Sequence, residues 1–369
     1  MKRFKINSKL RVLHVSTALS WRGGEQQLAY LIDELSATVD AFVLCAKGSE
    51  MEQFCIKNGV DHYCSKKGSS LDLGFALNLK RLCKKLEIEL CHLHDAHAHT
   101  FAILAASLFN NKTPLVLSRR VDFPIKKNWF SHFKYNHKQI VKILCVSDTI
   151  KEITAGGIVR KEKLSTVYSG IDLNKFKSRT FKLREELGIS KGTIVVGNTS
   201  AIADHKDYFT FVDAAEKLLL NNKNTLFLII GDGPLRHEVE AYVQSKNLER
   251  NIRFTGFRND IPEVLADLDI FFISSKTEGL GTSILDSFAA KVPVVGTAAG
   301  GIPELIEDNV TGKLCPVKAV DCLTESLLAL ISSSSLRHEL AENANKKVQQ
   351  FSKQATAEKT LKHYQSVFS

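Results

Sequence analysis

Residues 270–304 alternate short apolar runs with glycine-rich turns, and this alternation restricts the fold more than any other part of the sequence. Ile270–Ile273 and Val292–Val295 are apolar runs that favour buried strands. A glycine-containing turn follows each run, and residues 283–290 between them are expected to be helical. Strand, glycine turn and helix repeated in this way are typical of a parallel α/β sheet, which binds ligands at the carboxyl ends of its strands.

The first of these turns carries candidate binding groups. Glu278 precedes the turn 279–281, whose glycines free backbone N–H groups that favour phosphate next to a helix N-terminus. Thr282 or Ser283 is expected to cap the helix, and Ser283 with Asp286 has the spacing of a capping box. Glu278 in the loop and Asp286 in the helix are expected to reach one ligand from two sides.

At this point the sequence resembles the donor site of the retaining glycosyltransferases of family 4, which have the two-domain GT-B fold. The resemblance rests on E-G-L-G at 278–281, P-V-V at 293–295 and the G-G-I-P-E turn at 300–304. Where the family has a second Glu, this chain has Asp286, which keeps the charge and shortens the side chain by one methylene. The resemblance implies two Rossmann-like α/β domains that face each other across a cleft.

The length of 369 residues suits two domains of this size. Residues 165–176 resemble the interdomain crossing of the family. We therefore expect an acceptor-binding domain over 1–172 and a nucleotide-sugar-binding domain over 173–352. The resemblance implies that a final helix, 353–369, returns to the first domain.

Several other classes of protein are disfavoured. No apolar run approaches the roughly 20 residues that span a bilayer, and the basic N-terminus passes into a strand without the apolar region of a signal peptide. Eight cysteines without a C-x-x-C pair are expected to be reduced, buried thiols in a cytoplasmic protein. The dinucleotide fingerprint is absent, so no cofactor is expected besides the nucleotide-sugar substrate. Asp267 and Asp269 have the spacing of a metal-binding D-x-D, but Asp269 leads into a buried strand and no metal is expected.

Further donor-side candidates come from two other loops. Gly23 and Gly24 separate the first strand, 10–16, from a helix, and a glycine pair there lets another group approach the backbone; a tight turn is the alternative. By resemblance this loop faces the donor phosphates. Lys206 matches the lysine with which the family binds the donor diphosphate, and His205 stands beside it; a surface lysine is the alternative.

The resemblance implies a donor site and a mechanism. Lys206 and the loop N–H groups would stabilise the departing diphosphate, Glu278 would bind sugar hydroxyls, and configuration would be retained. His97 is the third candidate catalytic residue, on the acceptor side. The full set of donor-binding candidates is Gly23, Gly24, His205, Lys206, Gly231, Phe257, Arg258, Glu278, Gly279, Leu280, Gly281, Thr282 and Asp286.

The acceptor-side candidates are His97, His99, Arg119 and Arg120. The two histidines close the run HLHDAHAH after a predicted strand at 88–94. Zinc is the alternative, disfavoured because alternate residues of a strand point to opposite faces. Arg119 and Arg120 follow the next strand, where the family has a histidine near the reacting sugar. An arginine cannot act as a base, but it binds phosphate or carboxylate, so an anion clamp is expected.

Excess positive charge is confined to the first half of the chain. Up to Asp172 there are 26 Lys and Arg against 16 Asp and Glu, and beyond it 24 of each. An anionic partner is one explanation and a solvated basic surface the other. Within 119–142, seven basic residues and one acidic residue lie among aromatics. This suits contact with a membrane surface, whereas nucleic acid is not expected. The alternative is a helix with core aromatics and solvated lysines.

The resemblance therefore implies a retaining, metal-independent hexosyltransferase. It would move a sugar from a nucleotide-diphosphate sugar to a hydroxyl of a glycan or lipid-linked acceptor, in cell-surface polysaccharide or lipopolysaccharide synthesis. It is expected in the cytoplasm, free or peripheral at the inner face of the membrane. Two alternatives stay open: a GT-B nucleotide-sugar epimerase, and a degenerate subunit that binds the nucleotide sugar without turnover.

Overall fold

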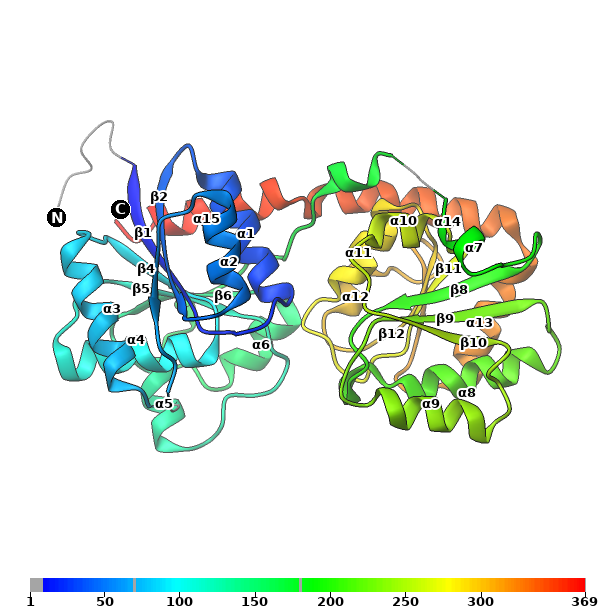
Figure 1. The fold of residues 1–369 in the computed structure, drawn as a ribbon. Coiled ribbons are helices and arrows are strands. Elements are labelled where there is room, and N and C mark those ends of the chain that lie inside the picture. The colour runs from blue at the N-terminus through cyan, green and yellow to red at the C-terminus, as the bar shows by residue number, and fades with distance from the viewer. Residues whose placement is uncertain (1–8, 69–70, 179–180, 369) are drawn as a thin grey trace. The chain divides into compact units, whose positions relative to one another are not determined.

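The protein is described by a computed structural model over residues 9–68, 71–178 and 181–368 (Figure 1). Contacts divide the chain into two compact units, Met1–Gly170 with Lys353–Ser369, and Ile171–Ser352. The chain passes from the first unit to the second after Gly170, two residues before the expected boundary at Asp172. It returns to the first unit at Lys353, as expected. The N-terminal residues 1–8, on which the signal-peptide interpretation rests in part, lie outside the described residues.

The first unit is built on a seven-stranded parallel sheet with the order β3-β2-β1-β4-β5-β6-β7. Its strands are β1 Leu10–Ser16, β2 Val39–Ala46, β3 His62–Ser65, β4 Leu90–Leu93, β5 Leu115–Arg119, β6 Ile140–Cys145 and β7 Leu164–Thr166. Its helices are α1 Gly23–Leu35, α2 Glu50–Asn58, α3 Leu73–Lys85, α4 Ala96–Phe109, α5 Trp129–Asn136, α6 Asp148–Ala155 and α15 Lys353–Gln365. The strand order reverses between β1 and β4, which makes their carboxyl ends the topological switch point.

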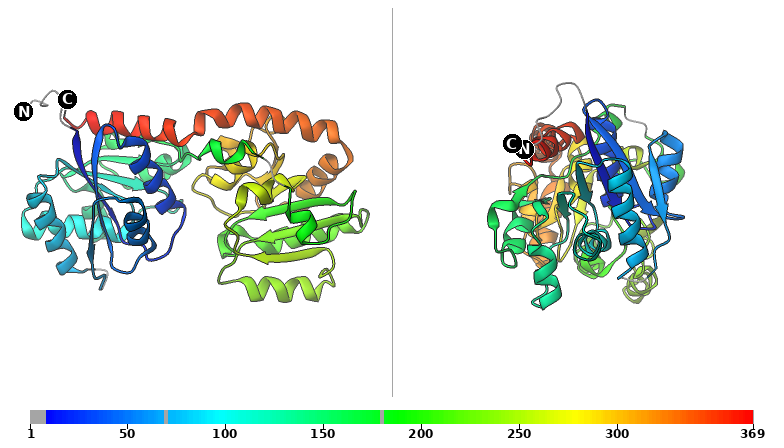
Figure 2. Two further views of the ribbon diagram at one scale, coloured as in Figure 1. Left: turned by 45° about the horizontal axis from the view of Figure 1, so that its top comes forward. Right: turned by 90° about the vertical axis from the view of Figure 1, so that its left-hand side faces the viewer.

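The final helix α15 completes the core of this unit. It packs against α1 (Figure 2), and its Tyr364 is fully buried in the cluster that holds Leu31, Leu90 and Val116. Lys353 at its start lies 3.0 Å from Asp33 and 2.9 Å from Glu34 of α1. The predicted return of the last helix to the first domain is therefore confirmed.

The second unit is built on a six-stranded parallel sheet with the order β10-β9-β8-β11-β12-β13. Its strands are β8 Ile194–Thr199, β9 Thr225–Ile230, β10 Ile252–Gly256, β11 Ile270–Ile273, β12 Val294–Thr297 and β13 Lys313–Cys315. Its helices are α7 Leu183–Glu186, α8 Tyr208–Leu219, α9 Arg236–Ser245, α10 Ile261–Ala266, α11 Thr282–Ala289, α12 Ile302–Leu305, α13 Val320–Ser332 and α14 Ser334–Val348. Short 3-10 turns lie at Leu173–Phe176 and Asp204–Lys206. The order reverses between β8 and β11, where β11 coincides with the predicted strand.

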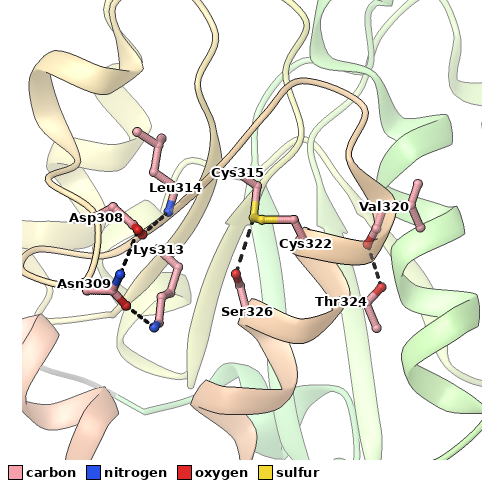
Figure 3. The surroundings of a disulfide bond; sticks show 9 residues. All are labelled: Asp308, Asn309, Lys313, Leu314, Cys315, Val320, Cys322, Thr324 and Ser326. Atoms are coloured by element: carbon pink, nitrogen blue, oxygen red, sulfur yellow. Dashed lines mark hydrogen bonds between the residues drawn. A yellow bond between two sulfur atoms is a disulfide. The ribbon is translucent and has the colours of Figure 1, made fainter.

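The expectation that all cysteines are reduced is wrong for one pair. Cys315 at the end of β13 and Cys322 in the first turn of α13 form a disulfide, with the Cα atoms 5.8 Å apart (Figure 3). The sequence places six residues between them, and only the fold brings the strand end and the helix start together. The other six cysteines are free thiols, and five of them are buried, as expected.

Asp267 and Asp269 connect α7 to the sheet. The Asp267 carboxylate accepts a hydrogen bond from the backbone N–H of Leu183 (2.7 Å), and Asp269 lies 2.6 Å from the Arg184 guanidinium. Both carboxylates thus have protein partners at the amino ends of the strands, away from the ligand-binding edge. In the described part of the chain, no helix is both long and apolar enough to cross a membrane.

Candidate functional site

Three loops meet at the carboxyl edge of the second sheet. They follow β8, β11 and β12, which are neighbours in the sheet. The backbone N–H of Lys276 donates to the carbonyl of His205 (2.8 Å), and the N–H of Gly301 donates to the carbonyl of Glu278 (3.0 Å). These bonds hold the loop that contains Glu278 between its two neighbours, at the switch point where α/β sheets bind ligands.

Gly300 allows the closest of these approaches. Its φ is +52°, and a Cβ atom at this position would lie 1.9 Å from the carbonyl oxygen of Glu278. No side chain fits in that space, and only glycine adopts such a backbone without cost. The second glycine turn of the sequence is therefore needed to bring the loop after β12 against the E-G-L-G loop.

Glu278 and Lys206 form an ion pair at the centre of this edge. The Lys206 ammonium donates to Glu278 Oε1, and the Ser275 hydroxyl donates to the same oxygen at 3.1 Å. The side chains of Lys206 and Glu278 are 13% and 11% exposed. The hydrogen bonds of the Glu278 carboxylate to described residues all go to Oε1, which leaves Oε2 to accept from a ligand. The structure thus unites two residues that the sequence placed 72 positions apart.

The predicted cap of α11 is wrong. The helix begins at Thr282 after Gly281, whose φ is +91°, and no side chain caps its first turn. The left-handed backbone of Gly281 replaces the extended residue that a Ser or Thr cap needs. The first N–H groups of α11 consequently lack a side-chain acceptor, and they favour an anion.

Asp286 lies one turn into α11 and is partly buried. Burial raises the pKa of its carboxyl to about 7, although the nearby Lys175 lowers it. Of the described residues, none makes an ion pair with Asp286 that would hold it ionised. Its carboxyl therefore changes protonation near neutral pH, unlike a freely solvated aspartate.

Three further donor-side candidates of this unit lie after two other strands: Gly231 follows β9, and Phe257 and Arg258 follow β10. Gly231, with φ +147°, brings its loop against the loop after β8, since a Cβ would lie 2.1 Å from the Ser200 carbonyl oxygen. Phe257 and Arg258 follow β10, at the edge of the sheet. The Arg258 side chain pairs with Glu186 (2.5 Å) and Asp260 (2.6 Å), which raise its pKa.

In the first unit, the glycine turn and an arginine meet at the switch point. A Cβ atom on Gly24 would lie 3.7 Å from Arg120 Nη1. Gly23 is the first residue of α1, and the helix has no side-chain cap. The donor-side candidate Gly24 and the acceptor-side candidate Arg120 thus lie close together, whereas a Cβ atom on Gly23 would meet no atom within 4 Å.

Arg120 is a partly buried cation without a paired carboxylate among the described residues. Its Nη1 donates to the carbonyl of His94 at 3.0 Å, and Nη2 lies 3.4 Å from His94 Nδ1. Burial lowers its pKa to about 10, while Glu25 and Asp95 raise it through longer-range attraction. Within the described residues no carboxylate forms an ion pair with Arg120, and its buried Nε has no hydrogen-bond partner. Such a group favours a bound anion.

Arg119 has a different environment, although it was predicted to share the role of Arg120. It is 6% exposed, and its guanidinium donates to the Tyr135 hydroxyl at 2.9 Å and to the carbonyl of Phe123. The guanidinium also lies 5.0 Å from the centre of the Phe123 ring. These contacts favour a structural role that holds the loop after β5.

His97 and His99 lie in the first turns of α4 and not at a strand end, so their predicted placement is wrong. The strand β4 stops at Leu93 because Asp95 caps the helix, accepting from the N–H groups of His97 and Ala98 at 2.9 Å each. His99 is fully buried, with Nε2 3.1 Å from the carbonyl of Lys134. His97 is partly exposed and stays the accessible one of the two.

A buried histidine cluster contradicts the expected separation of alternate histidines. His14, His92 and His94 place their ring nitrogens within 4.8 Å of one another. Residues two positions apart share one face of an extended chain, so His92 and His94 point to the same side, and His14 lies beside His92 on the neighbouring strand β1. Burial lowers all three pKa values, that of His14 to about 3. The three could ligate a metal ion. However, His92 contacts the hydroxyls of Tyr364 and Ser118 at 2.5 and 2.8 Å, and the Arg120 cation is close to His94.

Two acidic residues of this edge were not predicted. Asp95 accepts from the backbone N–H and the hydroxyl of Thr17, at 2.5 and 2.8 Å, in addition to capping α4. Glu25 is buried and accepts from the Ser16 hydroxyl at 3.1 Å. The sequence signal for Asp95 was present, since an aspartate between a strand and a helix is a typical cap.

Two family models match the chain. The model "Glycosyltransferase Family 4" matches residues 21–175, and the model "Glycosyl transferases group 1" matches residues 179–347. The matched ranges contain Gly24 and Arg120 of the first unit and the Lys206–Glu278 pair of the second.

Known proteins with similar sequences are glycosyltransferases. N-acetyl-alpha-D-glucosaminyl L-malate synthase of Bacillus anthracis is 25% identical over 80% of this chain and 78% of its own. UDP-Gal:alpha-D-GlcNAc-diphosphoundecaprenol alpha-1,3-galactosyltransferase of Escherichia coli is 23% identical over 93% of both chains.

Solved structures show the same fold. Anabaena Alr3699/HepE, crystallised with UDP and glucose, has a TM-score of 0.84 at 20% identity and covers 97% of this chain and 100% of its own. A glycosyltransferase from Rickettsia africae has a TM-score of 0.85 at 20% identity, over 98% and 99%. The architecture is therefore that of a GT-B fold, as predicted.

Proposed function

Because the chain belongs to glycosyltransferase family 4, we propose that it moves a hexose from a nucleotide-diphosphate sugar to a hydroxyl of a glycan or lipid-linked acceptor, with retention of configuration. The observation that carries this proposal is the Lys206–Glu278 pair beside the uncapped start of α11. A cation and free N–H groups suit a diphosphate, and a carboxylate suits sugar hydroxyls.

The donor diphosphate binds over Gly281 and Thr282, where backbone N–H groups point to it. Lys206 then exchanges a carboxylate partner for a phosphate partner. Glu278, released from part of that contact, accepts hydrogen bonds from the sugar. As the bond from the sugar to the diphosphate breaks, negative charge grows on the phosphate oxygens, and Lys206 with the N–H groups stabilises it.

The acceptor hydroxyl attacks from the face that the nucleotide leaves, so the configuration is retained. The departing diphosphate takes the proton of the attacking hydroxyl, and no side-chain base is needed. The charge that develops is met by Lys206 and the helix start, which is the basis for proposing a metal-independent reaction. His97 is the accessible acceptor-side histidine that contacts the incoming sugar or phosphate.

Arg120 binds an anionic group of the acceptor. Its lack of a paired carboxylate supports this role, as does a relative whose name contains L-malate, a dicarboxylate. Two relatives act on diphospho-undecaprenol-linked sugars, and a third acts in lipopolysaccharide core biosynthesis. We therefore place this chain in the synthesis of a cell-surface glycan, with a phosphate- or carboxylate-bearing acceptor.

A panel of UDP, GDP, ADP and CMP with their sugars tests the donor site through the melting temperature, since a ligand that binds the folded state raises it. We expect one nucleotide sugar to stabilise the wild type and the Glu249→Ala control. Glu278→Ala should keep the response to the nucleotide and lose the added response to the sugar. If no nucleotide sugar stabilises the wild type, the proposal is wrong. Donor conversion without any acceptor would favour an epimerase instead.

A further inference from the structure

The segment after Arg120 carries aromatic side chains that the core does not accommodate. Trp129 is 78% exposed and Phe123 56%, and Phe133 and Val121 are also exposed. The interpretation of this stretch as a helix with core aromatics is therefore wrong for these residues. Figure 1 shows the short helix α5 at the outer margin of the first unit, beyond α4.

The exposed aromatics form an ordered row along α5. The rings of Trp129 and Phe133 are stacked, with centroids 5.5 Å apart and planes at 9°. Phe133 meets His137 edge-on, also at 5.5 Å. Residues four positions apart share one face of a helix, so the row lies on one side of α5. The opposite side is anchored, because Tyr135 is buried and bonded to Arg119.

A second apolar and basic segment lies against α5. Asn136 accepts from the N–H of Val159 at 2.8 Å and donates to the carbonyl of Gly157 at 3.0 Å. Val159 is 70% exposed, and the exposed Arg160 and Lys161 follow it. The two segments therefore form a single surface.

We propose that this surface docks on an anionic lipid membrane. We name it the aromatic face and define it by exposed apolar and basic residues from the two segments. Its members are Val121, Phe123, Lys126, Lys127, Trp129, Phe133, Lys138, Val159, Arg160 and Lys161. Exposed aromatics with surrounding lysines match an interface where apolar groups enter the headgroup layer and cations meet lipid phosphates.

The charge of the aromatic face favours a lipid membrane over a second copy of this chain or a nucleic acid as its partner. Lys126, Lys127, Lys138, Arg160 and Lys161 contribute five positive charges, whereas Asp122 and Glu162 are the acidic residues within 121–138 and 157–163. A basic surface of this kind repels a second copy of itself. Single-stranded nucleic acid stacks its bases on ring faces, and the ring faces that Trp129 and Phe133 turn toward each other are closed to a base.

The position of the aromatic face deepens the proposed function and rests on it. Val121 follows Arg120 directly, and Phe123 contacts the Arg119 guanidinium. An acceptor carried by a lipid would reach Arg120 from the membrane with its anionic group leading. The partner of this surface is therefore the bilayer that holds the acceptor.

Trp129 reports on docking because the chain has two tryptophans, Trp21 and Trp129. In the Trp21→Phe variant of the full chain, fluorescence comes from Trp129 alone. Vesicles of phosphatidylglycerol and phosphatidylcholine should shift its emission to the blue, and brominated acyl chains should quench it. Phosphatidylcholine alone should cause a much smaller shift. An unchanged emission with anionic vesicles overturns the proposal.

Co-sedimentation with the same vesicles separates the apolar and electrostatic contributions. Lys126→Glu/Lys127→Glu should weaken binding by roughly tenfold or more, since each lysine near an anionic surface contributes about 1 kcal/mol. Phe123→Ser should weaken it as well. The matched controls are Lys191→Glu/Lys223→Glu and Phe181→Ser, which change exposed residues of the second unit and should bind like the wild type.

Other results would identify a different occupant. If the lysine control binds as weakly as Lys126→Glu/Lys127→Glu, net charge and not the aromatic face binds the membrane. A dimer in solution that Phe133→Ser dissociates would make this surface a contact between copies, and binding to an oligonucleotide without binding to vesicles would also overturn the proposal. The thermal response to the nucleotide sugar is measured in parallel. If the variants keep this thermal response, their donor site is intact, and a loss of vesicle binding then reports on docking alone.

Discussion

The two sheets place different electrostatics at the same topological position. In the second unit, the edge at β8 and β11 holds a closed ion pair between Lys206 and Glu278, with three loops bonded to one another. In the first unit, the edge at β1 and β4 holds the Arg120 cation, which pairs with no carboxylate among the described residues, above neutral histidines. The charges at the edge of the second sheet are thus paired without a ligand, whereas the Arg120 cation at the edge of the first sheet is not.

This difference indicates how each edge discriminates between ligands. A closed pair must be opened, so under the proposed function the second unit would bind a ligand that offers both a phosphate for Lys206 and hydroxyls for Glu278. A partly buried cation without a carboxylate partner gains from any anion of the right size, because its burial already costs free energy. Under the same proposal, we expect the first edge to accept a broader range of acceptors than the second edge does of donors.

The largest expected effect comes from breaking the closed pair. Lys206→Ala should lower kcat by roughly 100-fold or more, as removal of one donor from an oxyanion site does. It also leaves Glu278 half-buried without its cation, which lowers stability. Lys206→Ala/Glu278→Gln should regain the melting temperature but not the activity. Sugar transfer at the wild-type rate by Lys206→Ala would show that the pair is structural.

The charge of Asp286 should be visible in the pH dependence of unfolding. Its folded pKa of about 7 lies above the unfolded value of 3.8. The native state therefore binds the proton more tightly, and stability falls as pH rises from about 4 to 7. Asp286→Asn should be more stable than the wild type by about 4 kcal/mol at pH 8 and about equally stable at pH 4. Chemical unfolding at both pH values measures this, and equal differences at both would refute the raised pKa.

Arg120 should behave in the opposite way to Lys206. Arg120→Met removes a partly buried cation that has no carboxylate partner among the described residues, so it should not lower the melting temperature. It should raise the KM for an anionic acceptor by about tenfold, from the loss of a charge-assisted hydrogen bond, with donor affinity unchanged. Initial rates at varied acceptor concentration measure this. An increase in the KM for the donor instead would place Arg120 in the donor site.

The smallest effect concerns the histidine cluster beneath Arg120. Tyr364→Phe removes the hydroxyl that lies 2.5 Å from His92 Nδ1 and keeps the ring. We expect a loss of about 1 kcal/mol in unfolding free energy, typical of one hydrogen bond. Urea unfolding of this variant, with Tyr63→Phe as a control on a partly exposed tyrosine, measures it. A loss no larger than that of the control would show that the hydrogen bond between Tyr364 and His92 does not contribute to stability.

The sequence was sufficient where local pattern decides. β11 has the predicted bounds, and the return of the last helix was predicted from the resemblance to the family. It was insufficient where distant segments meet. The cap of α11 depends on the backbone of Gly281, the disulfide depends on the path from β13 to α13, and the histidine cluster depends on the pairing of β1 with β4.

The candidate site was predictable to a similar extent. Glu278 and Lys206 were each identified from their own motif, but their pairing is a property of the fold. Arg119 and Arg120 are identical in sequence terms, and only packing against Tyr135 and Phe123 distinguishes them. The exposure of Trp129 was likewise undecidable, because a helix with aromatics on two faces does not reveal which face is covered.

The place of α15 has a consequence for how the protein matures during synthesis. Tyr364, fully buried in the first unit, is made only after the whole of Ile171–Ser352 has been translated. The second unit is continuous in sequence and can fold as it leaves the ribosome, whereas the first unit waits with an open core for its last helix. The domain encoded first is therefore completed last, and truncation near the 3′ end of the message would damage the beginning of the protein.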